Sequence, residues 1–203
     1  MVSSSSRQAL KEWASVERAL AAGRVSLLVR KGGISERRGG FDVEHRAFWI
    51  FPTAFHQNAE ELAPEFRDLL SGAEPASRDD VRLRVFAEVA DAFRVESLDV
   101  MARLAGLHPM APETVRSRFE YKGRPYLHVI LVRAYVLPEP VVIPNTIGYE
   151  GCVSWVALDD EISTAGAVPV MADAEFEALR AEVRGRVAPS PRPPPPPAGA
   201  QGG

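Results

Sequence analysis

Residues Tyr126–Leu137, with the sequence YLHVILVRAYVL, form the strongest β-strand pattern in the chain. Val, Ile, Leu and Tyr dominate this stretch, and branched or aromatic side chains suit the pleated, half-buried surface of a sheet. A second long strand is predicted at Val81–Val95, where apolar and polar residues alternate. The chain is therefore expected to fold around a β-sheet.

Three shorter segments also have strand character. Val25–Lys31 is apolar in its middle, as expected of a mostly buried strand. Phe41–Phe51 alternates at first and then becomes continuously apolar, and Pro52 ends it because proline donates no backbone hydrogen bond. A further strand is predicted at Cys152–Leu158.

Helices are predicted between the strands from capping residues and from apolar residues at helical spacing. The first helix is expected over Arg7–Ala22, with a capping box made by Ser5 and Gln8. The others are expected at Asn58–Leu70, Ser97–Gly106, Pro112–Phe119 and from Asp173 to about Val183.

Strands interspersed with helices favour an α+β fold over a doubly wound βαβ array. We expect a small mixed sheet or half-barrel flanked by helices, as a single domain over residues 6–187. Residues 188–203 are rich in Pro and Gly and bury too little apolar surface to offset chain entropy, so a disordered tail is expected. The five consecutive prolines, Pro193–Pro197, either offer a polyproline II ligand to a protein partner or form a solubilising end.

The composition is that of a globular protein, with 46% hydrophobic and 25% charged residues. No run of about 18 apolar residues is present, so no membrane segment is predicted. The serine-rich start is not followed by an apolar segment, so no secretory signal is predicted. The single cysteine, Cys152, excludes an internal disulfide and suits a reducing cytoplasm, where we expect the protein to reside.

The net charge of −3 is unevenly distributed. Residues 1–58 carry +4, residues 59–150 carry −4 and residues 151–203 carry −3. Long-range attraction to phosphate is therefore expected only at the first of these segments. A dedicated non-specific DNA binder is usually basic overall, which this chain is not.

Several motifs that carry a specific chemistry are absent from the sequence. It contains no P-loop, no dinucleotide fingerprint, no nucleophile elbow and neither the paired-cysteine nor the HExxH pattern of zinc sites. The sequence therefore identifies no particular cofactor, and whether a cofactor or a metal is bound stays open.

The first candidate site is Arg30-Lys31-Gly32-Gly33, at the end of a predicted buried strand. Two glycines free the backbone to turn its N–H groups toward an anion, and the two cations add attraction. The same residues also fit a plain strand-ending turn with solvated side chains.

The second candidate site is a polar cluster after an aromatic strand. Glu44, His45 and His56 are candidate catalytic residues, because an imidazole can act as acid, base or metal ligand and a carboxylate can orient it. Thr53 and Gln57 are candidate ligand-binding residues beside them. In one flat strand Glu44 and His45 would face opposite sides, so joint action requires a bulge or a turn. The alternative is that both histidines bond to backbone in a loop that closes the core.

Tyr149, Cys152 and Ser154 form a third group, of candidate ligand-binding residues, around the start of a predicted strand. A cysteine beside a helix N-terminus or a protonated histidine can act as a nucleophile. A cysteine at a strand start is more often a small buried hydrophobe.

These motifs occur together in a known family. The matching segments are Ala9–Trp13, Leu28–Ile34, Phe41–Gln57, Arg118-Phe119, Leu131–Tyr135 and Tyr149–Trp155. On these segments, over about Ala9–Leu158, the chain resembles an uncharacterised prokaryotic family, Domain of Unknown Function 1802. Arg133, in the fifth segment, joins the candidate ligand-binding residues. Some members of that family are fused to a restriction-type endonuclease domain, so the resemblance implies a link to DNA restriction and defence.

Three functions are compatible with these features, and whether the protein is an enzyme stays open. The leading hypothesis is a non-catalytic or accessory module that binds an anionic ligand, either a nucleic acid or a nucleotide. The second is a metal-dependent phosphoester hydrolase or nuclease-like enzyme, in which Lys31 would stabilise developing charge beside the three candidate catalytic residues. The third is a protein-interaction domain that uses the proline-rich tail.

Overall fold

The computed structural model describes residues 3–32, 36–37, 40–41, 45–53, 58–70, 79–151 and 153–188. The strands are β1 (Ser5–Trp13), β2 (Leu27–Arg30), β3 (Glu36–Arg37), β4 (Gly40–Phe41), β5 (Ala47–Thr53), β6 (Asp80–Val95), β7 (Leu127–Pro144), β8 (Trp155–Ser163) and β9 (Val168–Pro169). In the described part of the chain, seven of them form one sheet in the order β2-β7-β6-β5-β1-β8, with β9 beside β7, and β3 pairs only with β4.

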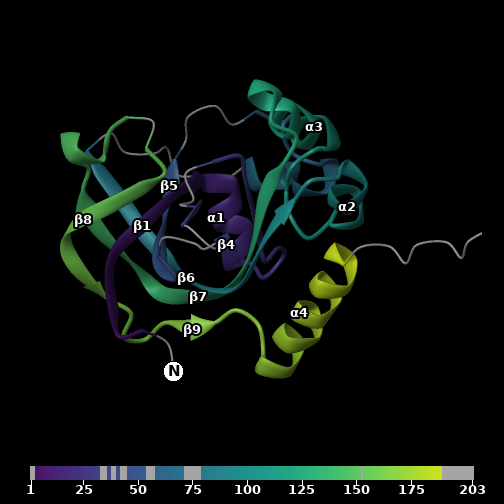
Figure 1. The fold of residues 1–203 in the computed structure, drawn as a ribbon. Coiled ribbons are helices and arrows are strands. Elements are labelled where there is room, and N and C mark those ends of the chain that lie inside the picture. Colours follow the sequence, from purple (N-terminus) through teal and green to yellow (C-terminus); the bar gives the residue numbers. More distant parts are fainter. Residues whose placement is uncertain are drawn as a thin grey trace, which may run out of the picture.

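The helices cover both faces of this sheet. They are α1 (Ala14–Ala21), α2 (Leu98–Arg103), α3 (Pro112–Glu120), α4 (Asp173–Val187) and the 3-10 helices η1 (Pro64–Leu70), η2 (Tyr121–Gly123) and η3 (Ile147–Tyr149). The sheet curves around α1, and α2, α3 and α4 lie together at one side of the molecule (Figure 1). No helix among the described residues is both long enough and apolar enough to cross a membrane.

The mixed character of the sheet confirms the predicted α+β class. β6 and β7 pair antiparallel along nearly their whole lengths, from Asp80↔Pro144 to Val95↔Leu127. β1 pairs parallel with β5 and antiparallel with β8. The two long strands expected from the sequence are therefore the longest strands of the observed sheet.

Side chains of β7 alternate between the two faces of the sheet, as the period of two residues in a strand requires. Ile130 and Val132 are completely buried on the inner face, in the same cluster as Leu20 of α1. Val129 and Leu131 are completely buried on the outer face, in the cluster that includes the outer helices. Because both faces are covered, β7 is apolar along its first half, which explains why its pattern is so strong in the sequence.

The predicted helix over Arg7–Ala22 is wrong in its first half. Ser5–Trp13 is strand β1, and helix α1 begins only at Ala14. Ser5 makes no capping box, and its hydroxyl donates instead to Glu161 on β8 at 2.6 Å. This segment forms a strand because β5 and β8 provide hydrogen-bond partners for its backbone on both edges. Tertiary pairing of this kind overrides helix propensity.

Two other predicted elements also differ from the structure. The helix expected over Asn58–Leu70 is the shorter 3-10 helix η1, which starts at Pro64, while the Asn58 side chain accepts hydrogen bonds from the N–H groups of Glu60 and Glu61. The strand expected over Phe41–Phe51 is divided between β4 and β5. The predicted tail lies outside the described residues from residue 189 onward.

β8 is an edge strand of the described sheet, and its pairing with β1 is irregular. The register shifts between Ser6 and Gln8, so β8 carries extra residues that bulge out of the ladder. That part of β8 presents three consecutive exposed carboxylates, those of Asp159, Asp160 and Glu161.

His108 is a buried titratable group between α2 and α3. Its side chain is 3% exposed, and its Nδ1 accepts a hydrogen bond from the backbone N–H of Met110 at 3.3 Å. No group in the described part of the chain pairs with its Nε2. Burial lowers the pKa of His108 to about 4, so the imidazole is held neutral.

This lowered pKa predicts a specific loss of stability in mild acid. The unfolded chain takes up a proton at His108 near its ordinary pKa of about 6.5, whereas the folded protein does so only near 4. The free energy of unfolding is therefore expected to fall as the pH is lowered through this window. His108→Asn keeps a hydrogen-bond acceptor but cannot titrate, and should flatten the dependence measured by urea unfolding at a series of pH values. An unchanged slope in the variant would contradict this assignment.

Candidate functional site

The candidate site lies where several strand ends meet. β1 and β5 run parallel, so their last residues, Trp13 and Thr53, are neighbours. Because β8 is antiparallel to β1, the residues just before it lie at the same end, and Arg30 reaches them from the end of β2. The result is a pocket of about 350 Å³.

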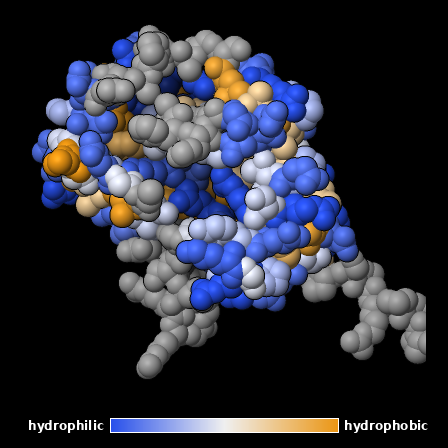
Figure 2. All heavy atoms as spheres, turned by 90° about the horizontal axis from the view of Figure 1, so that it is seen from above, coloured by the Kyte–Doolittle hydropathy of each residue, from blue (hydrophilic) through white to orange (hydrophobic). Residues whose placement is uncertain are grey.

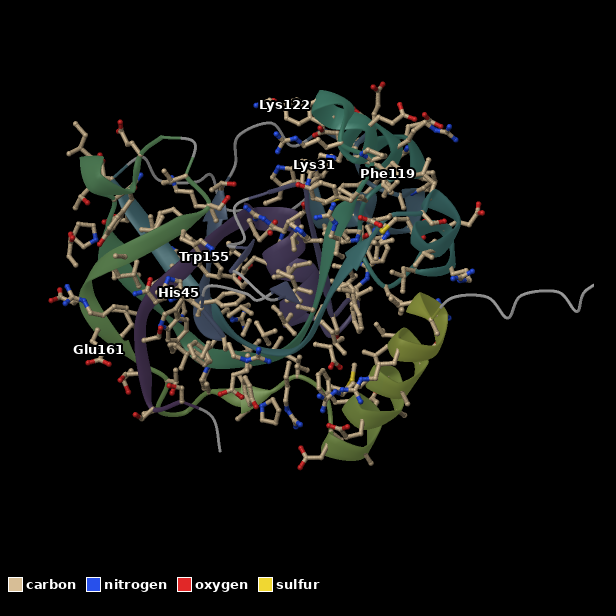
Figure 3. All side chains as sticks on the ribbon, in the orientation of Figure 1. Lys31, His45, Phe119, Lys122, Trp155 and Glu161 are labelled. Carbon is tan, nitrogen blue, oxygen red and sulfur yellow. The ribbon has the colours of Figure 1, made fainter. Side chains whose placement is uncertain are left out.

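We call this feature the cationic pocket. It is lined by Lys11, Glu12, Trp13, Arg30, Lys31, Gly32, Thr53, Arg118 and Ser154. Lys31 stands at the upper end of the molecule (Figure 3), and the view from above shows a hollow there with hydrophilic residues around it (Figure 2). Of these described side chains, four are cations and one is a carboxylate.

Five of the residues singled out in the sequence come together in this pocket, although they come from three separate segments of the chain. They are Arg30, Lys31, Gly32, Thr53 and Ser154. The reasoning from sequence missed Lys11, Glu12, Trp13 and Arg118 as site residues. Three of these, Lys11 to Trp13, lie in a segment that carries the family resemblance, and Arg118 lies in another. The segments that match the family could therefore have indicated these residues as candidates.

Arg30 connects separate parts of the pocket lining through three hydrogen bonds. Its guanidinium donates to the backbone carbonyl of Lys11 at 2.8 Å, to Glu12 Oε1 at 2.5 Å and to Ser154 Oγ at 2.7 Å. The side chains of Arg30 and Glu12 are only 14% and 8% exposed, so this ion pair is largely removed from water. Arg30 thereby joins β2 to β1 and to the segment that leads into β8.

Lys31 is turned away from Arg30 and toward α3. Its Nζ donates to the backbone carbonyls of Phe119 at 2.7 Å, Tyr126 at 3.0 Å and Arg124. The Nζ also lies 4.7 Å from the centre of the Tyr126 ring, within reach of a cation–π contact. Burial, followed by the charge of Arg124, lowers the pKa of Lys31.

Arg118 closes the pocket from α3. Its guanidinium carbon lies 4.5 Å from the centre of the Trp13 ring, a cation–π stack between α3 and the end of β1. Within the described part of the chain no group accepts a hydrogen bond from this guanidinium. Burial lowers the pKa of Arg118, the charge of Glu12 raises it, and the charge of Arg30 lowers it again.

The remaining polar groups of the pocket are tied to the same framework. The hydroxyl of Thr53 donates to the backbone carbonyl of Glu12 at 3.0 Å. Lys11 donates from its Nζ to the carbonyl of Gly151 at 3.0 Å, and its backbone N–H donates to the carbonyl of Ser154 at 2.9 Å. These bonds hold the segment before β8 against β1.

Three other residues singled out in the sequence lie away from the cationic pocket. His45 packs edge-on against Trp155, with ring centres 5.0 Å apart (Figure 3). Arg133 forms an ion pair with Asp173 at the start of α4. Tyr149 is buried, its hydroxyl oxygen accepts a hydrogen bond from the N–H of Asp159 at 2.9 Å, and burial raises its pKa.

Five more candidates fall outside the described residues. They are Gly33, Glu44, His56, Gln57 and Cys152. Among the residues that the structure does describe, no three His, Cys, Asp or Glu side chains are grouped so that they could hold a metal ion. The described lining of the cationic pocket contains a single carboxylate, that of Glu12, and Arg30 already engages it.

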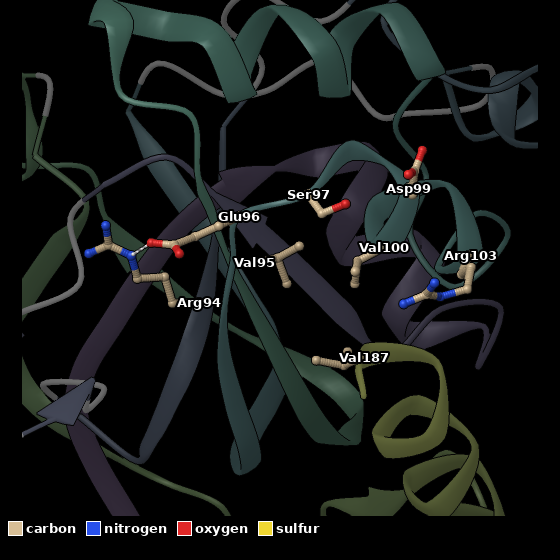
Figure 4. Close-up of a pocket in the computed structure, with 8 residues that line it drawn as sticks. All are labelled: Arg94, Val95, Glu96, Ser97, Asp99, Val100, Arg103 and Val187. Carbon is tan, nitrogen blue, oxygen red and sulfur yellow. Dashed lines mark hydrogen bonds and ion pairs between the residues drawn. The ribbon is translucent and has the colours of Figure 1, made fainter. Parts of the chain in front are cut away.

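A second pocket, of about 360 Å³, lies between the end of β6, α2 and α4 (Figure 4). Its charged groups largely satisfy one another or the backbone. Arg94 donates to Glu96 at 2.9 Å, and Arg103 donates to the backbone carbonyl of Arg186 at 2.8 Å. The second pocket therefore lacks the cationic excess of the first.

Comparison with solved structures found crystal structures of ASCH from Zymomonas mobilis. One is 11% identical with a TM-score of 0.45, covering 86% of this chain and 93% of that chain. A serine-to-alanine mutant is 12% identical with a TM-score of 0.41, covering 86% and 94%, and a tyrosine-to-phenylalanine mutant is 13% identical with a TM-score of 0.39, covering 86% and 96%. Similarities this weak establish neither a common fold nor a common function.

No curated protein matches the sequence. The match to a family model is extensive, since it spans residues 9–182 and so includes every residue that lines the cationic pocket. As the motifs in the sequence predicted, the chain belongs to the family described as Domain of unknown function (DUF1802).

Proposed function

We propose that this protein is a binding module that holds a phosphate group of a nucleotide or nucleic acid in the cationic pocket. One observation carries the proposal: the guanidinium of Arg118 faces the pocket, is stacked on Trp13, and has no hydrogen-bond acceptor among the described residues. Arginine has five N–H donors in a planar fork that matches phosphate oxygens. A ligand that supplies acceptors would complete this arrangement.

The stacking on Trp13 matters because it fixes the plane of the guanidinium before a ligand arrives. A side chain that is already ordered loses less conformational freedom on binding than a flexible one. Arg118 is also half-buried, and a charge partly shielded from water interacts more strongly with an anion than a fully solvated one. Both features favour the use of Arg118 for binding.

The charge of the pocket supports the same conclusion. Arg30 is held by Glu12, whereas Lys31 is held by backbone carbonyls that do not cancel its charge, so cations outnumber carboxylates among the described residues of the lining. The whole chain is acidic, with a net charge of −3, so the attraction is local. Such attraction falls off within a Debye length, about 10 Å at 0.1 M salt, and the complex should weaken as salt is added.

The first test removes the guanidinium of Arg118. Arg118→Gln should weaken binding of a fluorescein-labelled single-stranded oligonucleotide and of ATP by at least about tenfold, because hydrogen bonds to a charged group contribute about 1.5–3 kcal/mol. The measurement is fluorescence anisotropy for the oligonucleotide and calorimetry for ATP, both at low salt. Binding of the oligonucleotide without ATP would assign a nucleic acid as the ligand.

Arg116 provides a matched control on the same helix. Its side chain is 59% exposed and lies 3.9 Å from Glu113, outside the cationic pocket. Arg116→Gln removes the same charge from α3 and should leave both affinities close to those of the unmodified protein. The proposal fails if the unmodified protein binds neither probe, or if the two variants weaken binding equally.

A second test changes Glu12, the carboxylate that holds Arg30. Glu12→Gln preserves the shape of the side chain and an acceptor for Arg30, but removes a negative charge that repels phosphate. We expect binding of the oligonucleotide to strengthen several-fold, while the free energy of unfolding falls by about 3–5 kcal/mol because the buried charge of Arg30 loses its compensating carboxylate. Anisotropy and urea unfolding measure the two effects. A weaker complex would mean that the ligand donates to Glu12, against the charge argument.

A further inference from the structure

We propose that Lys31 is a positioning residue of the cationic pocket, which holds the end of α3 so that Arg118 faces the ligand, and that its ammonium does not contact the ligand. The role of Arg118 in this inference rests on the proposed function. The sequence alone suggests the opposite, since a lysine beside two glycines at a strand end is expected to meet an anion directly.

The hydrogen bonds of Lys31 leave no donor for a ligand. An ammonium group has three N–H donors and no acceptor. Each of the three has a backbone partner, in the carbonyls of Phe119, Arg124 and Tyr126. A phosphate oxygen could reach Nζ only by displacing one of these carbonyls.

The three carbonyls belong to the segment that fixes the end of α3. Phe119 follows Arg118 directly, and its carbonyl is among the last four of the helix, which have no donor within the helix itself. After it, Lys122 and Gly123 adopt positive φ angles of 57° and 64°, so the chain turns sharply before Tyr126. This turn brings carbonyls from both sides of it onto one ammonium.

Arg30 and Lys31 contact different elements of the fold although they are adjacent in sequence. Neighbouring residues at a strand end point to opposite sides. Arg30 therefore reaches β1 and Ser154, whereas Lys31 reaches α3, which lies at the same upper end of the molecule (Figure 3). The end of β2 thus contacts β1 through Arg30 and α3 through Lys31.

A double-mutant cycle separates positioning from direct contact. In the ligand-free protein, Arg118→Gln removes the cation from the Trp13 ring and should change the tryptophan emission spectrum. Lys31→Met should change it in the same direction, and the double variant should match Arg118→Gln alone, because two residues that act through one contact are not additive. The affinity for the labelled oligonucleotide should follow the same pattern, with a loss of about tenfold in each single variant and no further loss in the double variant.

Lys122 supplies the matched control, since it lies in the same turn and its Nζ is placed 5.2 Å from the centre of the Tyr121 ring. Lys122→Met removes an equal charge and should alter neither the emission spectrum nor, beyond about twofold, the affinity. Lys31→Arg keeps the charge but presents a planar group to three converging carbonyls, so it should behave like Lys31→Met. Circular dichroism establishes that each variant is folded, and Lys31→Gln replaces Lys31→Met if the latter is not.

The outcomes distinguish this inference from the proposed function. Additive losses of affinity, or an emission spectrum unchanged in folded Lys31→Met, would overturn the positioning role. If the unmodified protein binds neither the oligonucleotide nor ATP, the proposed function fails, while the emission cycle still decides whether Lys31 positions Arg118.

Discussion

The ion pair between Glu12 and Arg30 is the interaction on which the geometry of this protein depends. It joins the end of β2, at one edge of the sheet, to the end of β1, which lies next to the opposite edge. A buried pair contributes little net stability when intact, but the removal of one partner leaves an uncompensated charge and costs about 3–5 kcal/mol. The pair therefore acts mainly as a constraint on shape, which holds the end of β2 against the end of β1 at the pocket.

The same constraint explains how an acidic protein can hold a cationic site. Glu12 neutralises one arginine and fixes it, while main-chain carbonyls rather than carboxylates fix Lys31. Carbonyl groups satisfy the ammonium donors without cancelling the positive charge. The pocket thus retains its charge excess, with Glu12 as the single acidic side chain among the described residues of its lining.

The sequence predicted what depends on local pattern and missed what depends on pairing. Val81–Val95 and Tyr126–Leu137 were predictable because they are long and rich in residues that suit strands. Ser5–Trp13 was not, because buried Ala9 and Leu10 fit an amphipathic helix as well as a strand covered on both faces. Only the partners β5 and β8 decide between the two.

The site shows the same division. Arg30 and Gly32 could be predicted as site residues from the local sequence, since a basic pair before two glycines is a recognisable motif. Arg118 gives no such signal, because its importance comes from Trp13, more than a hundred residues earlier in the chain, and from the lack of an acceptor among the described residues. The contacts of Lys31 could not be predicted either, since its three acceptors are backbone carbonyls, which every residue has.

The bulged edge of β8 has a consequence for how copies of this protein behave at high concentration. An uncovered strand is a template onto which another chain can add, and runaway addition leads to fibres. Here the acidic triplet Asp159, Asp160 and Glu161 interrupts that template, and a like-charged strand from a neighbouring copy would be repelled at the point where it must align. The irregularity in the ladder is thus expected to hinder edge-to-edge pairing between copies at β8.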